Sequence, residues 1–179
     1  TGLWKRQGSG DSCTNAATGS AGWYYGAWNN RDAWCNFDTA AATSGTLASG
    51  SISLPAGSLY LGFAYFYETE STAASFDRRY VDISTNDGTS WTQLSQLSGD
   101  TMNTWLQKQI DISAYAGQPN VKIRFRFESG DAWYNAFRGW YVDDIVIYTT
   151  PTTSYSSNDN IPDNDAPNNM IAPYWDDLM

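Results

Sequence analysis

The chain has 179 residues and a net charge of −9, with Lys and Arg together numbering only 10. This length fits one domain with a sizeable core rather than two domains, and an acidic chain without a basic cluster argues against a nucleic-acid partner. No apolar run approaches the roughly 18 residues that a membrane helix needs, so we expect no membrane span.

The segment up to Ala42 is rich in Gly, Ser, Asn and Asp and has neither a strand period nor a helix period. We therefore expect a long irregular region here. Cys13 and Cys35 lie in it, and two cysteines in an acidic chain rich in Trp, Tyr, Ser and Thr favour an exported protein with a disulfide over free thiols. Closing a loop of 35 − 13 = 22 residues would stabilise the fold by about 3 kcal/mol.

Several large rings stud the same segment and cannot all face solvent, so we expect some of them to cover a sheet. They are Trp4, Trp23, Tyr24, Tyr25, Trp28 and Trp34. The segment is also where we expect a binding surface.

From Ser44 onward the rhythm changes to short runs rich in β-branched and aromatic residues. The predicted strands are residues 45–49, 51–54, 58–68, 79–85, 90–94, 104–112, 121–128 and 137–148. Asp87-Gly88 predicts a hairpin turn, and residues 113–119 predict a connecting turn with a short helical coil. Many short strands and no helical stretch predict an all-β fold, an antiparallel β-sandwich with jelly-roll topology.

Two of these strands alternate clearly between apolar and other side chains. In the strand 121–128, the residues predicted to face the core are Val121, Ile123, Phe125 and Phe127. In the strand 58–68 they are Leu59, Leu61, Phe63, Tyr65 and Tyr67.

The strand 137–148 carries two adjacent carboxylates, Asp143 and Asp144. Because side chains alternate along a strand, one of the pair is expected to point to the buried side of the sheet, where a charge needs a partner. The chain lacks histidine, and oxygen ligands suit calcium best. A neighbouring arginine or main-chain amides are the alternative partners.

After Thr149 the composition shifts to Thr, Ser, Pro, Asn and Asp. We therefore divide the chain into a module of residues 1–149 and a linker with an acidic, Asn-rich segment of residues 150–179. The second part is too short to form its own core, so we expect it either to lie across the module or to begin a following one. Its acids favour a solvated linker, with calcium binding as the alternative.

Seven motifs occur in an order that resembles the MAM-like jelly-roll modules of bacterial secreted proteins. They are residues 23–26, 35–39, 44–47, 52–55, 63–70, 81–91 (VDISTNDGTSW) and 138–145 (RGWYVDDI). Such modules occur in immune-inhibitor-A-like and subtilisin-like peptidases and in gingipain-type cleaved adhesins. The resemblance covers residues 3–148 and implies a non-catalytic accessory or adhesive domain with structural calcium. The family's upstream acidic strand, which can supply calcium ligands, is absent here. Because the chain starts abruptly at Thr1-Gly2-Leu3-Trp4 without a signal peptide, we expect an excised or processed piece.

By this resemblance Asp143 and then Asp144 are the first candidates for calcium ligands. Asp38, in the loop after Cys35, and Glu68, at a strand end, are further candidates. Calcium needs six to eight oxygens, so main-chain carbonyls or water must complete the site.

Four rings in polar, loop-like contexts are candidates for a glycan-binding platform: Trp28, Trp34, Trp133 and Tyr134. The alternative is that they seal the ends of the sandwich. We expect a secreted, monomeric accessory module that binds a polysaccharide or cell-surface glycan beside its own parent catalytic domain. A spacer or protein-interaction domain without glycan binding is a second hypothesis.

Catalysis is a third hypothesis, and few residues of the chain could support it. Without histidine, the chain has no Ser-His-Asp or Cys-His arrangement and no histidine-based zinc site. Jelly rolls do host glycosidases that use two carboxylates, and Glu68, Glu70, Glu128 and Asp131 are the acids available for such a pair. No longer catalytic motif surrounds them, so we expect no enzyme.

Overall fold

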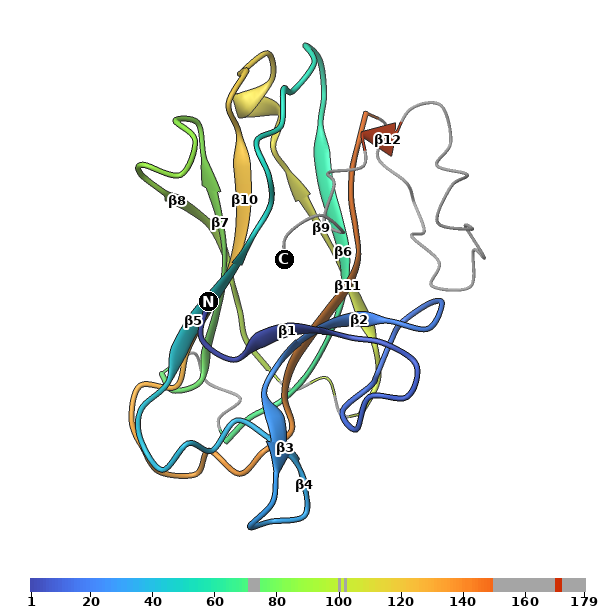
Figure 1. Cartoon of the computed structure of the whole chain (residues 1–179). Coiled ribbons are helices and arrows are strands. Elements are labelled where there is room, and N and C mark those ends of the chain that lie inside the picture. The colour runs from blue at the N-terminus through green and yellow to red at the C-terminus, as the bar shows by residue number, and fades with distance from the viewer. Residues whose placement is uncertain (71–74, 100, 102, 150–169, 172–179) are drawn as a thin grey trace.

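The computed structural model describes residues 1–70, 75–99, 101, 103–149 and 170–171. These residues form antiparallel strands and one 3-10 turn, Ser113–Tyr115, without any α-helix. Figure 1 shows two sheets packed face to face. The predicted all-β antiparallel sandwich is confirmed.

The sheet built around β11 has the strand order β1-β2-β11-β6-β9, with β12 beside β11. Its strands are β1 (Trp4–Gln7), β2 (Gly22–Tyr25), β6 (Tyr60–Glu68), β9 (Leu106–Asp111), β11 (Gly139–Tyr148) and β12 (Met170–Ile171). The sheet built around β10 has the order β5-β10-β7-β8. Its strands are β5 (Ser44–Ala48), β7 (Arg78–Ser84), β8 (Thr92–Leu97) and β10 (Lys122–Glu128). A separate hairpin pairs β3 (Ala27–Asn29) with β4 (Trp34–Asn36).

The core lies between these two sheets and follows the predicted alternation. Along β10 the apolar side chains are buried and the charged ones are half-buried. From β6, Leu61 and Phe63 enter the same core, and Trp140 of β11 packs edge-on against Phe125 with ring centres 5.9 Å apart. Tyr65 is only partly buried. The alternation read from residues 58–68 and 121–128 therefore located the core correctly.

The prediction of an irregular segment up to Ala42 was wrong in part, because four strands lie in it. β1 and β2 are four residues each, and β2 is covered on both faces, so Tyr24 and Tyr25 are both fully buried. A strand that is buried on both faces shows no apolar-polar alternation. The period of two that reveals a half-buried strand is therefore missing here.

A second apolar cluster covers the outer face of the β11 sheet. Tyr24, Phe66 and Tyr141 form it together with Cys13, and Trp105 packs against it. The Tyr141 hydroxyl donates a hydrogen bond to the main-chain oxygen of Cys13, 3.1 Å away. The predicted disulfide between Cys13 and Cys35 is present, so the loop of residues 8–21 is tied to β4 and lies over this face.

The predicted hairpin turn is confirmed at Asp87-Gly88, where both residues have positive φ, 57° and 88°. Residues 150–169 and 172–179 lie outside the described residues, and with them most of the predicted linker. Met170 and Ile171 pair with Tyr148 and Ile147 of β11. In the part of the chain that the structure describes, no helix is long and apolar enough to span a membrane.

Candidate functional site

One end of the sandwich gathers several connections that are distant in sequence. The register pairs Glu128 at the end of β10 with Ser44 and with Arg78, at the starts of β5 and β7. It also pairs Gly139, where β11 begins, with Glu68, where β6 ends. Residues 37–43, the described part of the β6–β7 connection (69–70 and 75–77) and residues 129–138 therefore emerge together, beside the β3–β4 hairpin at the bottom of Figure 1. We call these four segments the aromatic end.

All four rings predicted for ligand binding lie at the aromatic end and are exposed. Trp133 and Tyr134 are 74% and 75% exposed, and Trp28 and Trp34 are 47% and 41% exposed. Phe76, which the sequence analysis missed, is 41% exposed at the same end. The chain buries most of its other large rings, so the exposure of these rings needs an explanation. A binding surface is the usual explanation.

The hairpin rings do not form one platform. Trp28 is directly opposite Cys35, whereas Trp34 is opposite Asn29. Directly opposed residues share a face, and successive residues of a strand alternate between faces. Trp28 and Trp34 therefore point to opposite faces of the hairpin, and at most one of them can share a surface with the other rings.

Trp133 and Tyr134 stand at the tip of the loop 129–138, which is folded on its own polar groups. The Trp133 amide donates to Asp131 Oδ1 at 2.8 Å, and the Ser129 hydroxyl donates to the main-chain oxygen of Asp131 at 2.8 Å. Tyr134 has a φ of 54°, in the left-handed region. The turn holds the backbone, so both rings project without being packed into the core.

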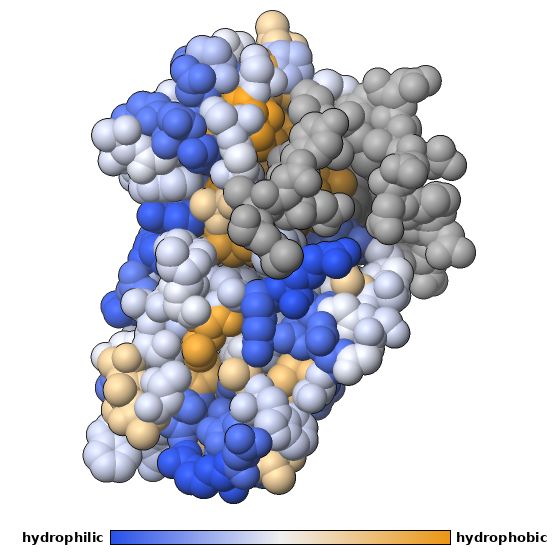
Figure 2. Space-filling model, viewed as in Figure 1, coloured by the Kyte–Doolittle hydropathy of each residue, from blue (hydrophilic) through white to orange (hydrophobic). Residues whose placement is uncertain are grey.

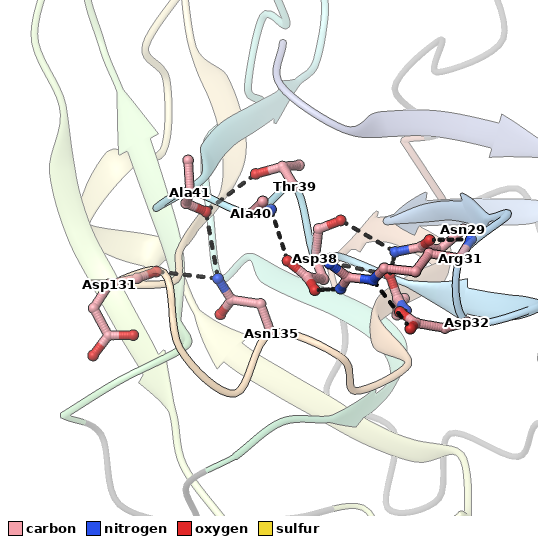
Figure 3. A network of polar contacts seen from close by, with 10 residues as sticks. Asn29, Arg31, Asp32, Asp38, Thr39, Ala40, Ala41, Asp131 and Asn135 are labelled. Atoms are coloured by element: carbon pink, nitrogen blue, oxygen red, sulfur yellow. Dashed lines mark hydrogen bonds and ion pairs between the residues drawn. The ribbon is translucent and has the colours of Figure 1, made fainter.

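Polar groups connect the hairpin to this loop (Figure 3). Arg31 pairs with Asp32 and with Asp38, and Asp38 Oδ1 accepts a hydrogen bond from the Ala40 amide at 2.7 Å. From the other side, Asn135 Nδ2 donates to the main-chain oxygen of Asp131 at 3.1 Å. A second, longer bond of 3.4 Å joins the same amide to the 37–43 loop. In Figure 2 this end is largely hydrophilic, so polar groups flank the exposed rings.

Asp143 and Asp144 do not enter the core between the sheets. The pairing of β11 with β6 shifts between Asp143 and Val146, which marks a β-bulge, and Asp144 has a φ of 48°. Asp143 lies on the same face as Tyr141, under the 8–21 loop. The expectation that one of the two acids points to the buried core side was wrong, because the bulge breaks the alternation on which it rested.

Main-chain amides hold the Asp143 carboxylate. Its Oδ2 accepts from Ala17 at 2.8 Å and from Thr18 at 3.4 Å, and its Oδ1 accepts from the Asp144 amide at 2.9 Å. The Thr18 hydroxyl donates to Asp144 Oδ1. Burial, and next the charge of Asp144, raise the pKa of Asp143 to about 7, although the amides act in the other direction.

These residues fit a calcium ion, which the family resemblance implies. A Cβ placed on Gly22 would lie 3.5 Å from Asp143 Oδ2 and 3.2 Å from the main-chain oxygen of Asn15. Gly22 thus lies close to a carboxylate and a carbonyl oxygen, both ligand types that calcium takes. Asp144 and the Thr18 hydroxyl add oxygens on the same side.

The structure does not bring Asp38 and Glu68 to this place. Asp38 belongs to the network at the aromatic end. Glu68 is four residues along β6 from Ala64, the partner of Asp143, which is about 13 Å at 3.3 Å per residue. Among the described residues, no three Asp, Glu, Cys or His side chains lie close enough to hold one metal ion.

The structure places the acids considered for a glycosidase in different surroundings. Glu128 pairs with Arg78 at 3.1 Å and also with Arg126. Glu70 lies near Asp131, and burial followed by the Asp131 charge raises the pKa of Glu70. Its amide donates to Asp77 Oδ2 at 2.9 Å. Asp77 is fully buried, and no sequence pattern had indicated it.

Comparison with known proteins supports the predicted resemblance. No family model matches the chain. It is 35% identical over 91 residues to Bacillopeptidase F of Bacillus subtilis (strain 168), and the match covers 51% of this chain and 6% of that protein. The chain thus spans a small part of the length of this relative.

Three solved structures share the fold. The K1 cleaved adhesin domain of Lys-gingipain from Porphyromonas gingivalis W83 has a TM-score of 0.53 at 14% identity, over 83% of this chain and 84% of that one. The K2 domain has a TM-score of 0.53 at 16% identity, over 82% and 83%. TmCBM61, solved with β-1,4-galactotriose, has a TM-score of 0.52 at 17% identity, over 84% and 86%. The expected likeness to adhesin-type β-sandwich modules of peptidases is confirmed.

Proposed function

We propose that this chain is a non-catalytic accessory module of an extracellular hydrolase, and that its aromatic end binds a glycan or another extracellular polymer. The observation that carries the proposal is the exposure of Trp133 and Tyr134 beside polar groups on one rigid end. Rings stack on the apolar faces of sugars while neighbouring polar groups bind the hydroxyls. The crystallised complex of TmCBM61 with a galactose trisaccharide supports glycan as the ligand.

An extracellular location is part of the proposal. The disulfide between Cys13 and Cys35 supports it, because such bonds persist in oxidising compartments. The similarity to a segment of Bacillopeptidase F supports a peptidase as the parent protein and its catalytic domain as a neighbour. The module itself acts as a monomer.

Calcium at Asp143 is the second part of the proposal. Asp143 and Asp144, with the Asn15 carbonyl and the Thr18 hydroxyl, are the residues that would hold it. The ion would neutralise two adjacent carboxylates where the 8–21 loop meets β11. Its role here is structural, since it would fix that loop over the outer face of the sheet.

The test is a glycan and polysaccharide binding screen on the intact chain, in calcium and again in chelator. We expect binding that Trp133→Ala weakens at least about fivefold, since one stacked ring contributes about 1 kcal/mol or more. Trp91→Ala is the matched control. Trp91 is a partly exposed tryptophan that stacks on Arg124 near the Asp87-Gly88 turn, at the opposite end of the sandwich. Equal losses in the two variants would contradict the location of the site.

A structural or protein-interaction domain is the second candidate function. The observation that favours it is the opposite orientation of Trp28 and Trp34, which suits contact with two different protein surfaces better than a flat sugar platform. Folded, calcium-loaded protein that binds nothing in the glycan screen but binds its parent catalytic domain would establish this alternative. Loss of that binding in Trp28→Ala would place the interface on the hairpin.

A further inference from the structure

Two buried side-chain oxygens at the base of the aromatic end have no hydrogen-bond partner. They are Asp77 Oδ1 and Asn135 Oδ1, and their residues are 0% and 2% exposed. Buried polar atoms in folded proteins are almost always paired, and a carboxylate oxygen without a partner is especially unfavourable. An ion or a water molecule bound to these oxygens would explain why they lack a partner in the protein.

The two residues depend on the same short stretch of backbone. The Asp77 amide donates to the Ser129 main-chain oxygen at 3.0 Å. The Ser129 hydroxyl and Asn135 Nδ2 both donate to the main-chain oxygen of Asp131, at 2.8 and 3.1 Å. A Cβ on Gly130 would lie 3.3 Å from the Phe76 ring. The start of β7 and the loop 129–138 are therefore in direct contact at this place.

Negative charge also gathers here. The Glu70 amide donates to Asp77 Oδ2 at 2.9 Å, which leaves Oδ1 as the unpaired oxygen of this carboxylate. Burial raises the pKa of Asp77 to about 7, and the charges of Glu70 and Asp131 act in the same direction. The nearby Arg79 lowers it in part. Its Nη1 donates to the Thr69 hydroxyl and to the main-chain oxygen of Asp77.

We propose that a calcium ion binds here, between β7 and the loop 129–138, through the side-chain oxygens of Asp77 and Asn135. Glu70 and Asp131 complete the charge, one of them through water, since no three acids in the described part of the chain converge on one point. Calcium accepts such a mixture of carboxylate, amide and water oxygens. Zinc would require nitrogen or sulfur ligands, and the chain has no histidine and both its cysteines form the disulfide.

This site involves the loop that carries two of the proposed binding rings. The loop that supplies Asn135 also carries Trp133 and Tyr134, so an ion bound to Asp77 would fix that loop to β7. In that respect the inference rests on the proposed function and makes ligand binding calcium-dependent. The ion binding itself is independent of any glycan and can be measured without one.

The experiment is a calcium titration by calorimetry on the full chain after removal of metal, in wild type and in the variants Asp143→Asn, Asp77→Asn and the double variant. We expect Asp143→Asn to retain one calcium and the double variant to bind none at the same concentrations. Asn135→Ala should weaken this remaining site at least about tenfold, because it loses one oxygen ligand. Asp87→Asn, an exposed acid paired with Lys122, is the control and should bind as wild type does.

Asp77→Asn removes a buried charge, so in chelator at pH 8 this variant should be no less stable than wild type. A loss of calcium binding in this variant would therefore not be caused by unfolding. If a variant does not fold, hydrogen exchange of the wild type decides: calcium should slow exchange in residues 129–138. Calcium stoichiometry that is unchanged by Asp77→Asn, or no protection of this loop, would overturn the inference and leave water as the buried partner. A failed glycan screen would not affect it.

Discussion

In metal-free protein, lowering the pH from 8 to 5 should raise the free energy of unfolding. Asp77 and Asp143 each have a pKa of about 7 in the folded state, chiefly because of burial, against 3.8 for an ordinary aspartate. For a raised carboxyl pKa, the folded state binds more protons than the unfolded state between the two values. The stability from this uptake is therefore full below about pH 4 and is lost as the pH rises through 7.

The size of the effect can be worked from these pKa values. Between pH 8 and pH 5 each carboxyl contributes about 2–3 kcal/mol to the free energy of unfolding, and the two together about 5 kcal/mol. For a domain of this size, 1 kcal/mol corresponds to roughly 2–4 °C in Tm. We therefore expect Tm in chelator to rise by about 10–20 °C over this range.

The assay is urea unfolding and calorimetry at pH 5, 6, 7 and 8 in excess chelator, then repeated in calcium. Asp143→Asn and Asp77→Asn should each remove about half of the rise. Asp87→Asn should leave it intact, because the Lys122 contact lowers the pKa of Asp87 and its contribution is lost only near pH 4. Calcium at pH 8 should replace the proton and flatten the curve. Stability that is flat or falls from pH 8 to pH 5 in chelator would refute the reasoning.

Three further changes should lower stability. Reduction of the Cys13–Cys35 bond should lower the free energy of unfolding by about 3 kcal/mol. It should also expose the segment between the two cysteines to protease before the sheets unfold. A reduced protein that resists protease would contradict this. Asp82→Ala should cost about 3 kcal/mol in urea unfolding, because the buried Asp82 carboxylate pairs with two β10 arginines at 2.6 and 2.9 Å; a neutral Asp82→Ala would mean that water replaces the carboxylate. Trp140→Ala removes a fully buried ring and should cost about 3–5 kcal/mol, which a loss under 1 kcal/mol would disprove.

The parts of the fold that sequence predicted are those in which local chemistry decides the structure. The alternation of Val121, Ile123, Phe125 and Phe127 needs only a sheet with one buried face, and β10 has that. The Asp87-Gly88 turn is set by two backbone conformations. β2 was missed because its second buried face depends on the 8–21 loop, which reaches it only through tertiary contacts such as Tyr141 with Cys13.

The sequence left open whether the candidate rings are exposed, and it gave no sign of their convergence. Trp28 and Trp133 are 133 − 28 = 105 residues apart, and only the strand register places their loops at one end of the sandwich. No local pattern marks Asp77 or Asn135 as buried, because their burial arises where β7 meets the loop 129–138. Similarly, the alternation rule failed at Asp144 because the bulge there is set by the pairing with β6.

The two buried aspartates share a placement that explains why the chain keeps them despite the cost of burying charge. Asp143 receives the amides of Ala17 and Thr18 from a loop that lies over one sheet. Asp77 lies where the loop 129–138 meets the other sheet. An apolar residue at either place would leave main-chain amides unsatisfied, those of Ala17 and Thr18 at Asp143 and that of Glu70 at Asp77. A bound cation, as proposed above, would neutralise each carboxylate and would help to order the loop that contacts it.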